Sequence, residues 1–381
     1  MLPYGRQAID DDDIQAVVDA LKGDYLTTGP AVKAFEQKLC DVTGAKYAVA
    51  CSNGTTALHL ACMALNLKEG ECAVVPTLTF LATANAVRYC GTDVVFCDVD
   101  PETGLMTADT LLEALSYAQS KGWVVKAVLP VHLAGQAVDL ADIRDITSQH
   151  NIKIIADACH AIGGTYQQTS IGACEFEDMS AFSFHPVKTI AMGEGGAVTT
   201  NNEKFAETMR TLRHHGMSKT DDMEPWAYEM QDLGYNYRVT DIQCALGTSQ
   251  LNKIDTFIEK RESLVALYNE KLADLSEYVK IPHRVQTGKT GWHLYAIRVD
   301  FEQLAIARAK LMDALKERGV GTQVHYIPVH TQPYYTNLYG ARDLPGAQTY
   351  YEKTLSLPLY PLMTEDDVSY VVKTLKDVLG E

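Results

Sequence analysis

Short apolar runs alternate with helix-like stretches along the first half of the chain. Runs suited to buried strands lie at residues 47–51, 72–76, 94–97, 124–131 and 152–157. Stretches with helical patterns lie at residues 11–22, 30–43, 55–67, 82–90, 108–119 and 140–150. Strands that alternate with helices predict a largely parallel, doubly wound sheet, so the expected fold class is α/β.

The alternation changes near residue 180. A strand at 180–184 leads into a polar turn, a glycine-rich segment at 193–196 and a second strand at 197–200. A helix at 203–214 is followed by a polar connection rich in aromatic residues, which we expect to pack on something, such as a second subunit. Helical patterns return at residues 240–257 and 255–273.

The last third of the chain mixes strands and helices in another order. Strand patterns near 292–299 and 323–326 flank a helical pattern at 301–318, which predicts a small α+β domain. A chain of 381 residues is also too long for one ordinary core. We therefore predict an amino-terminal arm (1–30), a large domain (31–254) and a small carboxy-terminal domain (255–381).

Composition narrows the function classes. The net charge is −16 and no basic run occurs, which argues against nucleic-acid binding. The nine cysteines include no C-x-x-C pair, so we expect reduced core residues in a cytoplasmic protein. His325 and His330 do not match a zinc-binding pattern, and no metal site is expected. The apolar window at 72–90 is interrupted by polar residues, so no membrane span is expected.

Lys188 is the first candidate for chemistry. It lies in the turn between the strands predicted at 180–184 and 197–200, where a rigid loop would fix its direction. Partial burial there would lower the pKa of its amine and favour Schiff-base chemistry. The alternative is an ordinary solvated loop lysine.

Asp157 shifts the balance between these two interpretations. It ends the apolar strand at 152–157, and α/β proteins usually build their sites at the carboxyl ends of parallel strands. A lysine aimed at an aldehyde and an acid aimed at a pyridinium nitrogen are the two groups that an enzyme of pyridoxal 5′-phosphate (PLP) needs most.

Three weaker signals accompany this pair. The small and hydroxyl residues at 52–56 connect a strand to a helix, and such a helix start binds phosphate or is simply capped. Phe80 is either a core residue or an aromatic that stacks on a planar cofactor. The hydroxyls of Thr27 and Thr28 either cap the next helix, which the sequence favours, or also touch a ligand.

Four motifs in this order carry a family resemblance: DACHA at 157–161, SAFSFHPVK at 180–188, GEGG at 193–196 and GYNYR at 234–238. Together they resemble the DegT-type nucleotide-sugar aminotransferases of PLP fold type I, over nearly the whole chain. The segments SFHPVK, LGYNYR and QVHY, together with His160, are especially similar to the pseudaminic acid branch of that family. Enzymes of this branch make UDP-4-amino-4,6-dideoxy-N-acetyl-β-L-altrosamine.

The resemblance implies roles for particular residues. Lys188 would form the Schiff base with PLP and then shuttle a proton, Asp157 would keep the pyridine nitrogen protonated, and His160 would lie against the ring or its phenolic oxygen. The remaining cofactor contacts would stack on the ring or hold the phosphate, with the asparagine supplied by the other subunit of a homodimer: Phe80, Gly54, Thr55, Ser183 and Asn236.

The implied reaction has two halves. L-Glutamate would convert PLP to pyridoxamine 5′-phosphate, which would then aminate C4 of a UDP-4-keto-6-deoxy-N-acetylhexosamine. The candidate substrate contacts are Tyr4, Thr27, Thr28, Arg238, His325 and Tyr326. For Arg238, a grip on a diphosphate and a structural ion pair are equally plausible.

Three other functions stay open. The chain could act on another nucleotide keto sugar at C4 or C3. It could instead be a PLP-dependent sugar dehydratase, although such enzymes typically replace the lysine, and Lys188 is present. It could also be a regulatory protein of the same fold without turnover.

Overall fold

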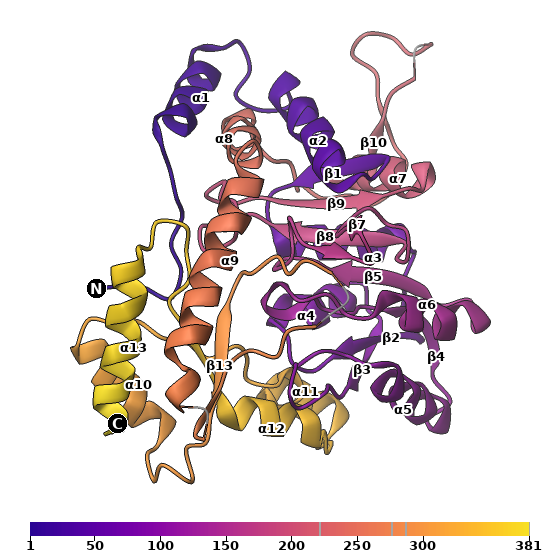
Figure 1. Cartoon of the computed structure of the whole chain (residues 1–381). Helices are drawn as coiled ribbons and strands as arrows, with labels where there is room; N and C mark the ends of the chain where they lie inside the picture. Colours follow the sequence, from indigo (N-terminus) through magenta and orange to yellow (C-terminus); the bar gives the residue numbers. More distant parts are fainter. Residues whose placement is uncertain (221, 276, 286–287, 381) are drawn as a thin grey trace.

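A seven-stranded sheet forms the centre of the larger part of the molecule (Figure 1). The computed structural model describes residues 1–220, 222–275, 277–285 and 288–380. The strand order is β1 (Tyr47–Cys51), β9 (Gly196–Thr200), β8 (Met179–Ser183), β5 (Lys153–Asp157), β4 (Val124–Val128), β2 (Glu71–Pro76) and β3 (Asp93–Cys97). Only β9 runs antiparallel to its neighbours, which confirms the predicted α/β class and mostly parallel sheet.

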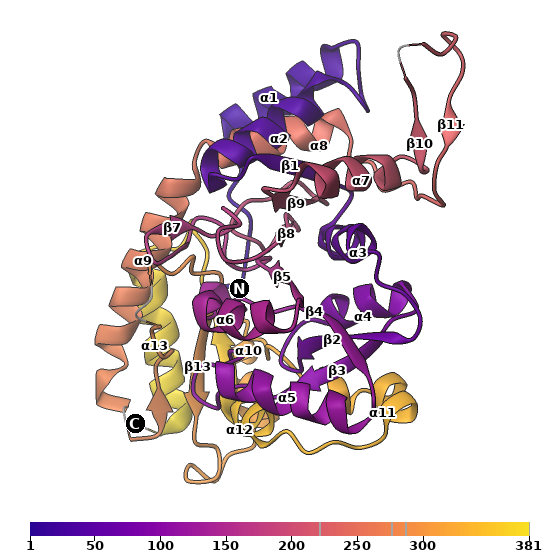
Figure 2. The ribbon, with the colours of Figure 1, turned by 90° about the vertical axis from the view of Figure 1, so that its right-hand side faces the viewer.

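Helices lie on both sides of this sheet (Figure 2). They are α2 (Pro30–Thr43), α3 (Gly54–Ala64), α4 (Leu81–Tyr89), α5 (Ala108–Ser120), α6 (Leu140–Gln149) and α7 (Glu203–Arg213). Each of these helices was predicted, and α3 ends three residues before the expected position at Leu67. A small hairpin, β6 (Thr165–Tyr166) with β7 (Thr169–Ser170), follows β5.

The carboxy-terminal part packs around a second hydrophobic core. It contains an antiparallel sheet of β12 (Val279–Lys280), β13 (Tyr295–Val299) and β14 (Thr354–Leu357), with α10 (Arg308–Glu317) and α13 (Glu365–Leu379). By contrast, α11 (Pro333–Tyr339) and α12 (Pro345–Lys353) place buried side chains in the first core. Of the predicted domain 255–381, residues 276, 286–287 and 381 lie outside the described part.

Three predicted elements differ from the structure. The two helices predicted at 240–257 and 255–273 are α8 (Asp241–Leu251) and α9 (Ile254–Lys271), so the boundary between them lies a few residues earlier than expected, at Asn252 and Lys253. The helix predicted at 301–318 starts only at Arg308, because residues 301–305 form a turn. Residues 323–326 make an isolated bridge between Gln323 and Ser356 instead of a strand.

The amino-terminal arm connects the two parts of the molecule. Leu2 pairs with Val320 beside the second core, whereas α1 (Asp11–Lys22) packs on α8. Asp10 caps α1, since its side chain accepts from the N–H of Asp13. The buried carboxylate of Asp13 forms an ion pair with Lys253 at 2.7 Å.

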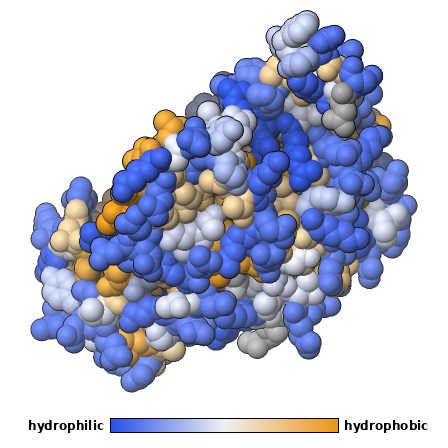
Figure 3. All heavy atoms as spheres, turned by 90° about the horizontal axis from the view of Figure 1, so that it is seen from above, coloured by the Kyte–Doolittle hydropathy of each residue, from blue (hydrophilic) through white to orange (hydrophobic). Residues whose placement is uncertain are grey.

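A narrow hairpin of β10 (Met217–Ser218) and β11 (Glu229–Met230) projects from the body, at the upper right of Figure 2. Seen from above, most side chains at this end of the molecule are hydrophilic (Figure 3). The hairpin segment nevertheless exposes large apolar side chains, including Trp226 and Leu233, which are each 77% exposed.

The nine cysteines are all free thiols, as expected; six of them are buried core residues, whereas Cys40, Cys90 and Cys159 are only partly buried. In the part of the chain that the structure describes, no helix is long and apolar enough to cross a membrane.

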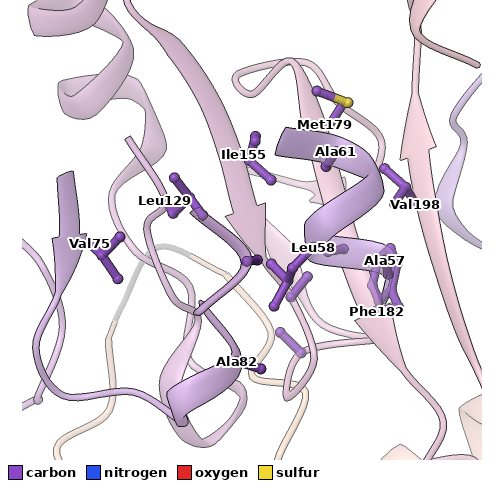
Figure 4. Packing of buried hydrophobic residues seen from close by; sticks show 14 of the residues in the cluster. Ala57, Leu58, Ala61, Val75, Ala82, Leu129, Ile155, Met179, Phe182 and Val198 are labelled. Atoms are coloured by element: carbon purple, nitrogen blue, oxygen red, sulfur yellow. The ribbon is translucent and has the colours of Figure 1, made fainter. Parts of the chain in front are cut away.

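Small residues let α3 approach the sheet closely. Figure 4 shows Ala57, Leu58 and Ala61 of α3 beside Phe182 of β8 and Val198 of β9, and all five are buried. A helix with small side chains on its packed face can lie near the strands. The N-terminus of α3 is thereby held at the carboxyl end of β8.

Candidate active site

A cavity of about 650 Å³ opens at the carboxyl ends of β5 and β8. It brings together ten of the fourteen predicted site residues: Tyr4, Gly54, Thr55, Phe80, Asp157, His160, Ser183, Lys188, His325 and Tyr326. These residues are spread along the chain from position 4 to position 326. The fold therefore assembles most of the predicted site in one place.

Lys188 lies in the connection between β8 and β9, as predicted. Backbone hydrogen bonds close this loop at both ends, from the Phe184 N–H to the Gly195 oxygen at 2.8 Å and from the Met192 N–H to the Phe184 oxygen at 2.9 Å. Surrounding protein lowers the pKa of the Lys188 amine through desolvation, against the weaker opposing effects of Cys159 and Asp157. The amine thus loses its proton more readily than that of an ordinary lysine.

Asp157 lies at the end of β5 and is 6% exposed. Its Oδ2 accepts a hydrogen bond from the Thr83 hydroxyl at 2.7 Å, and its Oδ1 accepts from the Cys159 N–H at 3.1 Å. These two donors fix the direction of the carboxylate on the cavity wall. Sequence reasoning missed Thr83, because nothing in its surroundings in the chain distinguishes it from other helix threonines.

His160 lies three residues after Asp157 and is also buried. The Ala134 N–H donates to its Nδ1 at 3.3 Å, and its Nε2 lies 3.1 Å from the Tyr326 hydroxyl oxygen. Burial, with smaller effects from Lys188 and His325, holds the pKa of His160 well below its usual value. The imidazole is therefore neutral at physiological pH.

The N-terminus of α3 provides a cradle beside this group. Asn53 caps the helix by accepting from the Thr56 N–H at 2.9 Å. The N–H groups of Gly54 and Thr55 precede the first intrahelical hydrogen bond, so they have no acceptor within the helix. A Cβ on Gly54 would lie 2.7 Å from the Ser183 Cβ, so only glycine fits. Two N–H groups and the Ser183 hydroxyl at a helix N-terminus suit an anion such as phosphate.

The opposite wall comes from the arm and the carboxy-terminal part. His325 Nδ1 lies 2.8 Å from the Ser356 hydroxyl, and its ring centroid lies 5.4 Å from that of Tyr4. Phe80 remains 57% exposed, so it is not a core residue. A ring at the cavity mouth can instead stack on a planar ligand.

Four predicted residues do not line this cavity: Thr27, Thr28, Asn236 and Arg238. They lie close to α8 or α7, since Thr27 bridges to Thr240 and Asn236 bridges to His214. Arg238 donates to His214 Nδ1 at 3.0 Å, so its partner is an imidazole and not the carboxylate of an ion pair.

The expected capping of α2 by Thr27 or Thr28 is wrong. The N-cap residue is Gly29, which has no side chain, and the Asp241 carboxylate accepts from the N–H groups of Gly29 and Ala31 at 2.8 and 2.9 Å. A distant carboxylate thus satisfies the helix terminus. The two threonine side chains stay exposed.

Comparison with known proteins identifies relatives over the full length. Residues 7–376 match the sequence model of the DegT/DnrJ/EryC1/StrS aminotransferase family. The spore coat polysaccharide biosynthesis protein SpsC of Bacillus subtilis is 38% identical over 386 residues, which cover 99% of this chain and 97% of SpsC.

Solved structures of sugar aminotransferases share the fold. Helicobacter pylori PseC, an aminotransferase involved in the biosynthesis of pseudoaminic acid, matches with a TM-score of 0.92 and 28% identity, over 100% of this chain and 99% of that one. The putative sugar aminotransferase Spr1654 of Streptococcus pneumoniae, in its PMP form, matches with a TM-score of 0.90 and 28% identity over the same shares of the two chains.

Proposed function

Because the chain belongs to the DegT/DnrJ/EryC1/StrS aminotransferase family, a family of PLP-dependent sugar aminotransferases, we propose that it binds PLP at Lys188 and transfers an amino group to a nucleotide-linked keto sugar. The observation that supports this most directly is that Lys188 and Asp157 line one cavity together with the open N-terminus of α3. An amine, an acid and an anion cradle are the groups that the aldehyde, pyridine nitrogen and phosphate of PLP require.

The residues present fit this cofactor. The N–H groups of Gly54 and Thr55 and the Ser183 hydroxyl would hold the phosphate, in a cradle that a side chain on Gly54 would fill. Asp157 would face the pyridine nitrogen, and the side chains that would contact the ring are Phe80 and His160. When bound, PLP supplies an electron sink that lets an amino group pass from donor to acceptor.

The chain itself would supply proton transfer and orientation. Lys188 Nζ would take and return a proton at the carbon that gains or loses the amino group, and desolvation, which lowers its pKa, favours the neutral amine that this role requires. Thr83 and Cys159 would keep the Asp157 carboxylate aimed at one position in the cavity. These contacts orient the Asp157 carboxylate in the same way during both halves of the reaction.

We also propose that a second copy of the chain completes the site. Thr27, Thr28, Asn236 and Arg238 lie outside the cavity of their own chain, and the nearby hairpin exposes Trp226. A large exposed apolar side chain on a projecting hairpin suits an interface between subunits. Asn236 would then reach the partner's phosphate cradle, and Arg238 would meet the diphosphate of the nucleotide sugar.

Mixing two inactive variants tests the shared site. Lys188→Ala removes the amine and Asn236→Ala removes the residue assigned to the partner's cavity, so each homodimer should be inactive or severely impaired. A heterodimer of the two has one intact site, and activity should return after subunits exchange. If sedimentation shows that mixed dimers form but activity does not return, Asn236 acts within its own chain.

For the substrate, we propose L-glutamate as donor and a UDP-4-keto-6-deoxy-N-acetylhexosamine as acceptor, giving UDP-4-amino-4,6-dideoxy-N-acetyl-β-L-altrosamine for pseudaminic acid. The support is the similarity of the Lys188, Arg238 and Tyr326 segments to that branch, and the likeness to PseC. The higher identity to SpsC, named for spore coat polysaccharide biosynthesis, favours a second candidate: another nucleotide keto sugar, aminated at C4 or C3.

A spectroscopic assay separates these functions. Purified protein should be yellow, bleach on addition of L-glutamate and regain its colour only with an acceptor sugar, so a panel of nucleotide keto sugars with product NMR identifies the substrate. Loss of a hydroxyl without amination would indicate a dehydratase, and binding without turnover would indicate a regulatory protein. Lys188 in the cavity favours the aminotransferase over both.

A further inference from the structure

The His160 imidazole is held on several sides by groups from distant parts of the chain. Besides its contacts with Ala134 and Tyr326, its ring centroid lies 4.4 Å from that of His293, at an interplanar angle of 48°. His293 is 4% exposed and does not line the cavity. Nothing in the sequence around His293 indicates a role at the site.

The segment that carries His293 is fixed by backbone contacts to the large sheet domain. The N–H of Gly291 donates to the Gly135 oxygen at 2.9 Å, and the N–H of His293 donates to the Ala134 oxygen at 3.0 Å. Gly135 has φ +97°, and a Cβ there would collide with the Gly291 carbonyl. This close approach requires glycine.

Two residues of α9 hold the other side of the same segment. The buried guanidinium of Arg261 donates to the carbonyl oxygen of His293 at 3.3 Å and to that of Leu359 at 2.9 Å. Glu262 accepts from the Trp292 indole N–H at 2.8 Å. His293 therefore presents a rigid face to His160.

Hydrogen-bond chemistry then determines the tautomer of His160. A backbone N–H can only donate, so the contact from Ala134 makes Nδ1 the acceptor. A neutral imidazole with an acceptor at Nδ1 carries its proton on Nε2, and this N–H donates to the Tyr326 oxygen. Burial raises the pKa of the Tyr326 phenol far above its usual value, so Tyr326 keeps its own proton.

We propose that His293 and Tyr326 are positioning residues that hold His160 as the Nε2–H tautomer, and that Tyr326 consequently turns its hydroxyl hydrogen toward the cavity as a donor. The hydroxyl oxygen already accepts from His160, and Tyr326 lines the cavity. The group it recognises must therefore be a hydrogen-bond acceptor, such as a carbonyl oxygen. The assignment of that ligand rests on the proposed function, whereas the tautomer does not.

The tautomer can be measured in the apoprotein without any turnover. In protein labelled with 15N-histidine, a long-range 1H–15N correlation distinguishes a protonated from an unprotonated ring nitrogen, and a His160→Asn variant identifies the His160 signals. A single form with the proton on Nε2 is expected. A His160 signal with the proton on Nδ1, or a ring protonated on both nitrogens near pH 7, would overturn the proposal.

Three variants test the positioning. His293→Ala should let His160 populate a second ring state, whereas His293→Phe keeps an aromatic ring there and should preserve the single form. Tyr326→Phe removes only the hydroxyl and should shift the Nε2 signal. Unchanged His160 spectra in both His293→Ala and Tyr326→Phe would show that Ala134 alone fixes the ring.

A kinetic arm tests the donor role with a matched control. Tyr335→Phe also removes a hydroxyl from a buried tyrosine, one that donates to Asn85 Oδ1 at 2.7 Å outside the cavity. Tyr326→Phe should lower kcat/KM for the keto acceptor by about tenfold, roughly the value of one hydrogen bond, and Tyr335→Phe should leave it unchanged. Bleaching by glutamate checks the proposed function separately, and equal kinetics in the two variants would refute the donor role.

Discussion

The hydroxyl of Thr83 offers the sharpest test of how the site is built. Thr83 is fully buried in α4, and its hydroxyl donates to Asp157 Oδ2 at 2.7 Å. Thr83→Val keeps the volume and branching of the side chain and removes its hydroxyl, which also lies 2.8 Å from the Thr79 hydroxyl oxygen. Of the two hydrogen bonds to the Asp157 carboxylate, only the one from the Cys159 N–H, at 3.1 Å, would then remain.

The size of the effect follows from the charge on the acceptor. A hydrogen bond to a charged group contributes about 1.5–3 kcal/mol, and each 1.4 kcal/mol is about tenfold in a rate or equilibrium constant. If the bond orients Asp157 toward the cofactor, Thr83→Val should weaken PLP binding or lower kcat/KM by roughly 10- to 100-fold. The apoprotein should also unfold more easily, by about 1–3 kcal/mol.

Thr147→Val is the matched control. Thr147 is equally buried in α6, but its hydroxyl donates to the Arg144 carbonyl oxygen at 3.2 Å, away from the cavity. The control should lose about 0.5–1.5 kcal/mol of stability and show normal turnover and cofactor absorbance. If Thr83→Val has the same spectrum, PLP affinity and turnover as the control, the idea that Thr83 orients Asp157 is wrong.

Three further predictions use the same cavity. Burial lowers the folded-state pKa of Lys188, so the unfolded chain binds more protons between that value and the ordinary value of about 10.4, and stability rises with pH in this window. The Lys188→Met apoprotein lacks this titration, so it should be inactive yet more stable than the wild-type apoprotein near pH 7. The difference between their free energies of unfolding, measured by chemical denaturation, should narrow toward pH 10. A difference in unfolding free energy that does not change with pH would show that burial does not lower the pKa of Lys188. Gly54→Ala places a Cβ 2.7 Å from the Ser183 Cβ, so it should cost about 1–3 kcal/mol of stability and weaken PLP binding in a fluorescence titration; wild-type affinity would show that the cradle is not used. Asp157→Asn should lower turnover by several orders of magnitude in a glutamate half-reaction assay, and a loss within about tenfold would show that another group serves the pyridine nitrogen.

Much of the fold was predictable because its strands are apolar on both faces. The runs that become β2, β3 and β5 are buried almost throughout, and burial on both sides is what produces a continuous apolar run. The exact boundary between α8 and α9 was not predictable, since Asn252 and Lys253 carry no proline or glycine signal. Lys253 instead pairs with Asp10 and Asp13 of the distant arm.

The residues of the candidate site also divide into those that the sequence predicts and those that it does not. Lys188 and Asp157 could be found because each lies at a strand end in a recognisable local pattern. Thr83 could not, because its partner lies 74 residues away and only tertiary folding brings the two together. The capping role expected of Thr27 and Thr28 failed for the same reason, since Asp241 supplies the cap from more than two hundred residues away.

The walls of the cavity come from different parts of the chain, and this has a consequence for control of the reaction. Lys188 and Asp157 lie at strand ends of the large sheet. Tyr326 comes from the last third of the chain but packs against the first core, and His293 lies between Trp292 of the second core and Leu294 of the first. His160 is the residue where the two meet, through contacts of 3.1 Å to Tyr326 and 4.4 Å between the rings of His160 and His293. A displacement of Tyr326 or of the His293 segment would therefore act first on the His160 ring. A ligand that contacts Tyr326 in the cavity would thus be sensed by His160 through the 3.1 Å contact between the Tyr326 hydroxyl oxygen and His160 Nε2.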